Sequence, residues 1–168
     1  MTARISFVAM CAVVIGLVGC NRRAFTVPGE SMEPTFRRGD RVTADIWAYA
    51  LHPPRRWDVV VVHPKAADLK DVVWVMRIVA LPGEKISFSD GHILIDGTLL
   101  VPPPQIAAIY FKDLGSQPSS SDAGPTIHPY TVPKDCYYVV GDNPLAAYDS
   151  RAWGSLPRGN ILGRVLDK

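Results

Sequence analysis

The sequence predicts a mostly β domain of short antiparallel strands, and three observations lead to this prediction. Short runs rich in Val, Ile and Trp recur along the chain between clusters of Gly, Pro and charged residues. Two Asp-Gly pairs separate such runs, as is typical of β-hairpin turns. The chain also has 15 prolines and 13 glycines among 168 residues, which disfavours a helical bundle because proline breaks a helix interior. The strands are expected to wrap as a barrel or sandwich.

The expected elements follow in order. Strands are predicted at residues 41–45, 57–63, 72–80, 85–88, 92–95, 137–141 and 161–166. The pairs Asp90-Gly91 and Asp96-Gly97 flank the strand at 92–95 and predict a meander. The only helix expected after the amino-terminal segment is a short one at residues 44–51. From 102 to 133 Pro and Ser become frequent, so this segment is predicted to be a surface excursion that buries little.

Composition excludes several classes of protein. With 18 Lys and Arg against 16 Asp and Glu, the formal net charge is +2, so nucleic acid is not an expected partner. Hydrophobic residues at 48% and charged residues at 20% are typical of a globular domain. Three cysteines cannot form a disulfide framework, and the four histidines lack the spacing of metal ligands. Neither a metal nor another cofactor is expected.

The amino terminus carries an uncharged segment. Residues 5–19, ISFVAMCAVVIGLVG, separate Arg4 from Arg22 and suit a signal-peptide core or a short hydrophobic anchor helix. The segment runs into Leu17-Val18-Gly19-Cys20, which resembles a lipobox, the bacterial motif whose cysteine is lipidated. A lipoprotein signal ending at Cys20 and an uncleaved anchor both remain open. Either one assigns residues 1–23 to membrane attachment, makes membrane lipid a partner, and places residues 24–168 on the extracytoplasmic face of a bacterial inner membrane.

Four sequence boxes follow the uncharged segment. They are Ser31-Met32-Glu33-Pro34-Thr35, Arg38-Gly39-Asp40-Arg41-Val42, Arg77-Ile78-Val79-Ala80-Leu81-Pro82-Gly83-Glu84, and Gly141-Asp142-Asn143 with Asp149-Ser150-Arg151-Ala152-Trp153-Gly154. In this order the boxes resemble those of type I signal peptidases, the serine peptidase family S26. The resemblance extends from residue 27 to about residue 163. It implies the family's core of two antiparallel β-sheets, with residues of about 89–133 as its variable β insertion.

The resemblance also implies roles for individual residues. Ser31 matches the nucleophile, and a serine hydroxyl needs a nearby base because a protonated alcohol is a poor nucleophile. In this family the base is a lysine, which burial keeps neutral by lowering its pKa. The expected supporting residues of the active site are Arg77, Asp142, Asn143, Asp149, Ser150 and Arg151. Met32 and Phe36 are expected to line the cleft that receives the small side chains of a signal-peptide cleavage site.

Two positions depart from the family pattern. Met76 precedes Arg77, where the family has its general-base lysine, and a thioether cannot accept the proton. Ala146 and Ala147 replace the Asn-Ser pair whose serine orients that lysine. No other residue is an evident base. Lys70 is six positions from Met76, about 20 Å along a strand at about 3.3 Å per residue, and His63 is expected to end a strand.

Three functions agree with this pattern. The first is a serine endopeptidase that cleaves the signal peptides of exported precursors at the membrane surface, with Met76 in the lysine position. The second is an inactive pseudopeptidase that binds precursors or a partner peptidase. The third is a maturation peptidase of the conjugative-pilus type, which shares the same serine and lysine boxes. Because the base and the hydroxyl that orients it are lost together, the sequence leaves the enzymatic activity open.

Overall fold

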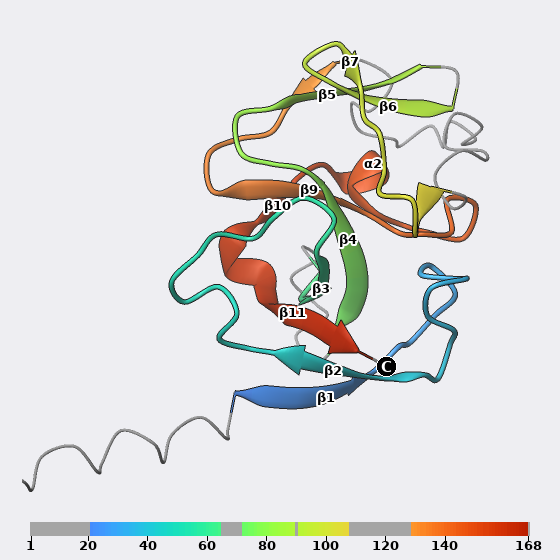
Figure 1. The fold of residues 1–168 in the computed structure, drawn as a ribbon, viewed down its shortest axis with the longest axis vertical. Coiled ribbons are helices and arrows are strands. Elements are labelled where there is room, and N and C mark those ends of the chain that lie inside the picture. The colour runs from blue at the N-terminus through green and yellow to red at the C-terminus, as the bar shows by residue number, and fades with distance from the viewer. Residues whose placement is uncertain (1–20, 65–71, 90, 108–128, 168) are drawn as a thin grey trace, which may run out of the picture.

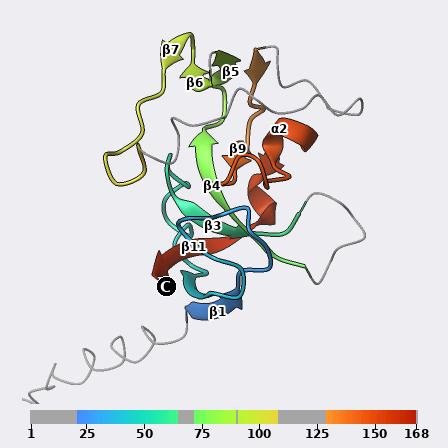
Figure 2. The same ribbon diagram turned by 90° about the vertical axis from the view of Figure 1, so that its right-hand side faces the viewer.

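The computed structural model describes residues 21–64, 72–89, 91–107 and 129–167, which form two antiparallel sheets (Figure 1). The smaller sheet lies at the end of the molecule opposite β1 (Figures 1 and 2). In spatial order, the seven-stranded sheet contains β1 (Arg22–Thr26), β2 (Arg41–Asp45), β11 (Ile161–Asp167), β3 (Val59–Val62), β4 (Trp74–Ala80), β9 (Cys136–Val140) and β10 (Leu156–Pro157). The four-stranded sheet contains β7 (Thr98–Leu99), β6 (His92–Ile95), β5 (Lys85–Ser89) and β8 (Tyr130–Thr131). The prediction of a mostly antiparallel β protein is confirmed.

The predicted strands agree with the structure to within two residues at each end. β2 and β6 have the predicted bounds, and β9 begins and ends one residue earlier than predicted. β3 begins two residues late, because Trp57 has a φ of 74°, which does not suit a strand. The carboxylate of Asp58 accepts the Arg55 N–H at 2.9 Å and closes this turn. Local turn chemistry therefore sets where β3 begins.

The helix predicted at residues 44–51 is wrong. Ala44 and Asp45 are the last two residues of β2, and Ala44 pairs with Arg23 of β1 and Val165 of β11. Residues 46–49 form a turn, and the carboxylate of Asp45 accepts the Trp47 N–H at 2.8 Å. An aspartate that accepts a backbone donor two residues on is found in turns and at helix starts alike, and here the chain continues as a turn. Strand pairing on both sides of β2 thus overrides the local helix propensity.

Several elements were not predicted from the sequence. β1 pairs along its whole length with β2. Its first two residues, Arg22 and Arg23, belong to the segment 1–23 that was predicted to attach the protein to the membrane. The short strands β7, β8 and β10 were also missed, as were helix α2 (Ser150–Trp153) and the 3-10 helix η2 (Arg158–Asn160). The expected amino-terminal helix and lipobox at residues 5–20 lie outside the described residues. Of the helices that are described, none has the length and apolar character needed to cross a membrane.

The core consists of three clusters of buried side chains. One packs the smaller sheet against β9 and the end of β4, and the other two include alternate residues of β3 and β4. Val61 and Val75 belong to one of these two, and Val60 and Met76 to the other. Because successive side chains point to opposite faces of a strand, β3 and β4 are buried on both faces. This explains why their sequences are apolar on both faces instead of alternating, with the buried Arg77 of β4 as the exception.

Candidate functional site

Ser31 lies in the turn between β1 and β2 and is half-buried. Its carbonyl oxygen accepts the backbone N–H of Asn143 at 2.9 Å. The side-chain amide of Asn143 donates to the carbonyl of Glu30 at 3.3 Å, across 113 positions of sequence. The Ser-Met-x-Pro-Thr box and the Gly-Asp-Asn box, both found from sequence, are therefore bonded to each other.

Gly141 brings three of the candidate positions together. A Cβ on this residue would overlap the carbonyl oxygen of Ser31 and the Cβ of Ala147, so both lie against the glycine backbone. In the antiparallel ladder of β4 and β9, Arg77 is opposite Val140, and the same register continued by one residue sets Met76 opposite Gly141. The backbone of the candidate nucleophile and the side chain of Ala147 thus lie against one glycine, and Met76 is one register step along β4 from Arg77.

We expect Gly141→Ala to destabilise the protein by about 1–3 kcal/mol, the usual cost of forcing an extra methyl into a close-packed site. The methyl group would push apart the Ser31 backbone and Ala147. Urea denaturation followed by circular dichroism measures the loss. Gly159→Ala is the matched control, because a Cβ there meets nothing within 4 Å. Equal stability of the two variants would contradict the close approach at Gly141.

Met76 is surrounded by apolar side chains. It is 2% exposed and pairs with Val60 of β3. Its cluster contains aliphatic and aromatic residues of β3, β4, β9, β10 and β11: Val60, Val62, Ile78, Tyr137, Val139, Leu156 and Ile161. Such a site would lower the pKa of a lysine, because burial disfavours the charged amine. The thioether that occupies it has no proton-accepting nitrogen to activate a hydroxyl.

Arg77 forms a buried ion pair with Asp142. Its Nε donates to Oδ1 at 2.8 Å and its Nη2 to Oδ2 at 2.6 Å, and the two side chains are 6% and 0% exposed. Nη1 donates to the Trp57 carbonyl at 3.0 Å. The hydroxyl of Thr35 donates to Asp142 Oδ2 at 2.5 Å. The pair therefore links β4 to the Gly-Asp-Asn turn and to the turn that carries Ser31.

A second buried pair holds the loop that contains Ala147. Arg151 donates from Nε and Nη2 to the carboxylate of Asp149 at 2.9 and 2.8 Å, and also to the Pro144 carbonyl at 3.0 Å. Asp149 accepts the N–H of Gly141 at 3.0 Å and caps α2 through the N–H of Arg151. Ser150 accepts the N–H of Val139 at 3.0 Å. The charge-assisted bonds of Asp149 and Arg151 hold the loop between Gly141 and α2 in place.

Met32 and Phe36 lie in the hydrophobic core, with 0% and 8% exposure. They share a cluster with Val61 of β3 and Val75 of β4. A role for either residue in a substrate cleft remains a prediction. Sequence reasoning also missed Thr35 and Gly141 as site residues. Both belong to the quoted boxes, but the contacts that give them a role come from other parts of the chain.

His63 and Lys70, weighed above as alternative bases, and three further titratable residues lie elsewhere or outside the described residues. The Nδ1 atom of His63 lies 3.3 Å from the Val72 carbonyl, at the end of the ladder away from Gly141. Lys85 is exposed at the start of β5 in the smaller sheet. Cys136 is half-buried at the start of β9. Lys65 and Lys70 lie outside the described residues. Within the described part of the chain, no group of three or more His, Cys, Asp or Glu residues could hold a metal ion.

The fold and site define a class of protein: an antiparallel β protein whose serine-bearing turn is bonded to a Gly-Asp-Asn turn and braced by two buried Arg–Asp pairs. The family described as "Signal peptidase, peptidase S26" matches residues 1–166. This chain therefore belongs to the S26 signal peptidase family, which confirms the resemblance seen in its sequence boxes.

Two curated relatives and one solved structure are named as signal peptidases I. The chain is 35% identical to "Signal peptidase I" of Leptolyngbya laminosa over 83% of its own length and 64% of the relative's. It is 34% identical to "Probable signal peptidase I-2" of Synechocystis over 96% of its own length and 69% of the relative's. A crystal structure of a signal peptidase I from Enterococcus faecalis V583 aligns with a TM-score of 0.46 and 22% identity, covering 67% of this chain and 96% of that chain.

Proposed function

We propose that this protein binds the signal peptides of exported precursors at a membrane surface, at a site beside Ser31, without using a Ser–Lys dyad. Membership of the signal peptidase family supports this substrate class. The Arg77–Asp142 and Asp149–Arg151 pairs support a retained scaffold around the site. Binding needs that scaffold, whereas hydrolysis also needs a base.

One observation carries the proposal. Ala147 lies against Gly141 and Met76 is a buried thioether in β4, and by resemblance to the family these are the positions of the orienting serine and of the lysine. With neither an amine nor a second hydroxyl from these two positions, Ser31 lacks the partners that activate a serine nucleophile in this family. A matched loss of both groups favours a binding role over turnover.

Cleavage by Ser31 is the second candidate. The turn that presents Ser31 is still bonded to Asn143, and this retained geometry would serve an enzyme as well as a binder. A base outside the family pattern would then be required. A conjugative-pilus type of maturation peptidase requires the same base, so the same experiment tests it.

The test uses the full chain in detergent and a fluorescent synthetic signal peptide with small residues at its cleavage site. We expect saturable binding by fluorescence anisotropy and intact peptide by mass spectrometry. A matched peptide with charged residues in place of its apolar core should bind much more weakly. If neither peptide binds, the proposed function is wrong. Turnover that disappears in the Ser31→Ala variant would establish the second candidate.

Membrane attachment through Cys20 gives a separate prediction. If the lipobox is used, Cys20→Ala should abolish fatty-acid incorporation and leave a longer precursor, because the lipidated cysteine becomes the first residue of the mature chain. Metabolic labelling with a fatty acid and gel mobility measure this. Cys136→Ala, a change at a half-buried thiol in β9, is the control and should keep the label. An unlabelled parent chain of unchanged mobility would instead support the uncleaved anchor.

A further inference from the structure

The loop between Gly141 and α2 exposes large apolar side chains beside the candidate site. Leu145 and Tyr148 are 67% and 64% exposed, on either side of the half-buried Ala147. Single exposed apolar residues are ordinary on protein surfaces, but these two flank the position that matches the orienting serine of the family. We call Leu145 and Tyr148, together with Trp74 of β4, the apolar lip.

Neighbouring side chains hold Tyr148 in place while its ring remains exposed. The ring meets that of Trp74 edge-on, with centroids 6.4 Å apart and an interplanar angle of 79°. The Tyr148 carbonyl accepts the indole N–H of Trp153 at 3.2 Å, and the next residue, Asp149, is buried in its ion pair with Arg151. The exposed ring is therefore positioned before a ligand arrives, which lowers the entropic cost of binding.

The loop part of the lip is close to Ser31. A Cβ on Gly141 would lie 2.4 Å from the Ser31 carbonyl oxygen and 2.5 Å from the Cβ of Ala147, so these two atoms are near neighbours. Tyr148 is the next residue, and consecutive Cα atoms are about 3.8 Å apart. The Tyr148 Cα is therefore about 10 Å or less from the Ser31 carbonyl oxygen.

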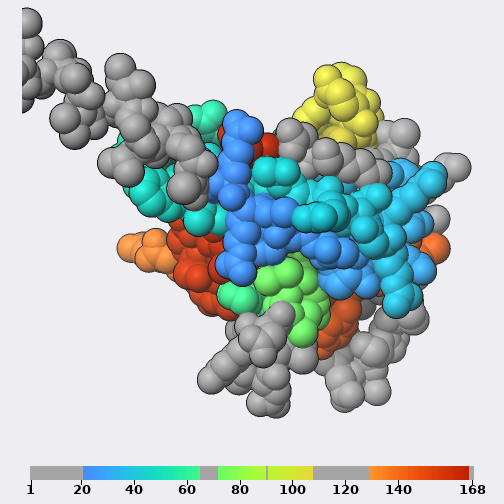
Figure 3. Space-filling model, turned by 90° about the horizontal axis from the view of Figure 1, so that it is seen from below, coloured from blue at the N-terminus to red at the C-terminus, as the bar shows by residue number. Residues whose placement is uncertain are grey.

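The lip continues the surface of the candidate site onto β4. Trp74 is half-buried at the first position of β4 and packs against the cluster that contains Met76. Because side chains two residues apart point to the same face of a strand, Trp74 shares a face with the position that matches the family's lysine. Figure 3 shows the light green start of β4 at the surface, next to the blue chain of β1 and the turn that follows it. The lip thus adjoins both positions that depart from the family pattern.

We propose that the apolar lip receives the carboxyl end of the apolar core of a bound signal peptide. This inference rests on the proposed function. A signal peptide has large apolar side chains in its core and small ones at its cleavage site, so a leucine and two aromatic rings complement the core. The three residues of a small-x-small cleavage site span about 10 Å when extended. A peptide whose cleavage site lies at Ser31 would therefore bring the end of its core to the lip.

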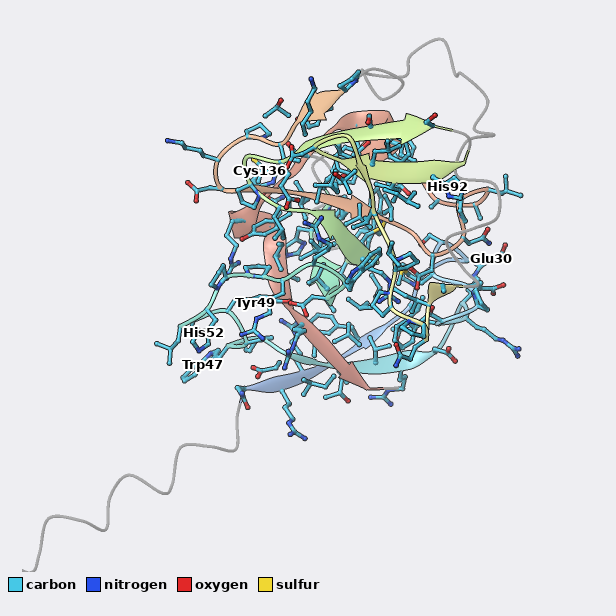
Figure 4. All side chains as sticks on the ribbon, turned by 45° about the horizontal axis from the view of Figure 1, so that its top comes forward. Glu30, Trp47, Tyr49, His52, His92 and Cys136 are labelled. Carbon is cyan, nitrogen blue, oxygen red and sulfur yellow. The ribbon has the colours of Figure 1, made fainter. Side chains whose placement is uncertain are left out.

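The test measures the fluorescence anisotropy of the synthetic signal peptide bound to the full chain in detergent. Tyr148→Ser and Leu145→Ser should each weaken binding about tenfold, because each removes a large apolar contact with the peptide. Tyr148→Phe keeps the ring and should bind as the unmodified chain does. Trp47→Ser is the matched control, because Trp47 is an aromatic residue with 66% exposure. Figure 4 shows Trp47 on the opposite side of the molecule from Glu30, the neighbour of Ser31, so its loss should leave binding unchanged.

Two altered peptides identify which segment lies on the lip. One has alanine in place of the last two apolar residues of the core, and the other has alanine in place of the two residues after the cleavage site. In a double-mutant cycle, the loss caused by Tyr148→Ser should shrink with the first peptide and persist in full with the second. The opposite pattern would place the segment after the cleavage site on the lip and overturn the inference.

The remaining outcomes separate the lip from the function on which it rests. If both serine variants bind the peptide as tightly as the unmodified chain, or if Trp47→Ser causes an equal loss, the lip is wrong and the proposed function stands. Urea denaturation shows whether each variant is folded, and Leu145→Ser tests the lip independently of Tyr148. If the unmodified chain binds no signal peptide, the proposed function and the lip are both wrong.

Discussion

The double variant Met76→Lys with Ala147→Ser is expected to cleave a precursor that the unmodified protein leaves intact or nearly so. Ala147 lies against Gly141, as does the Ser31 backbone, and Met76 matches the family's lysine position, so the two changes restore an amine and the hydroxyl that orients it. Losing one member of a serine protease's catalytic set costs up to about 10⁶ in turnover. We therefore expect the gain to be large, measured as product formed from a precursor with small residues at the cleavage site.

The single variants serve as controls for this result. Met76→Lys alone should do poorly, because an amine without its partner hydroxyl lies unpositioned in an apolar cluster and costs stability. Ala147→Ser alone supplies no base. Adding Ser31→Ala to the double variant should remove the new activity. Efficient Ser31-dependent cleavage by the unmodified protein would contradict this interpretation and require a base outside the family pattern.

Asp142→Asn is expected to cause the largest loss of stability among the substitutions considered. The change keeps the shape of the side chain but leaves the Arg77 guanidinium, whose side chain is 6% exposed, facing an uncharged amide. Removing one partner of a buried ion pair typically costs about 3–5 kcal/mol, because the remaining charge is not compensated. Urea denaturation of the full chain in detergent measures the change in the free energy of unfolding.

Glu84→Gln provides the matched comparison. Glu84 pairs with Arg56, but these side chains are 20% and 22% exposed, so the expected cost is closer to the about 0–1 kcal/mol of a surface pair. Glutamine can still accept the N–H of Leu81 that Glu84 accepts at 2.7 Å. Equal losses for Asp142→Asn and Glu84→Gln would show that burial of the Arg77–Asp142 pair does not decide its contribution.

The sequence alone determined the class of fold, most strands and the family. β2 and β6 were predicted to the residue, and for β6 the reason is local, because its apolar run lies between the turn pairs Asp90-Gly91 and Asp96-Gly97. The boxes around Ser31, Arg77, Asp142 and Asp149 identified the family because several short motifs occur in one order. The absence of a lysine at Met76 is likewise a fact of sequence.

Only the tertiary structure decided how these parts meet. A helix predicted at residues 44–51 overlapped the strand predicted at 41–45, and the strand prevails because both neighbouring strands, one of them distant in sequence, pair with β2. Thr35 and Gly141 became site residues through contacts with Asp142, Ser31 and Ala147. Local propensity acts over a few residues, whereas strand pairing joins residues as far apart as Thr43 and Asp167, 124 positions along the chain. For this reason the sequence could indicate which groups are missing from the site, while the close packing of Ser31 and Ala147 against Gly141 was visible only in the folded chain.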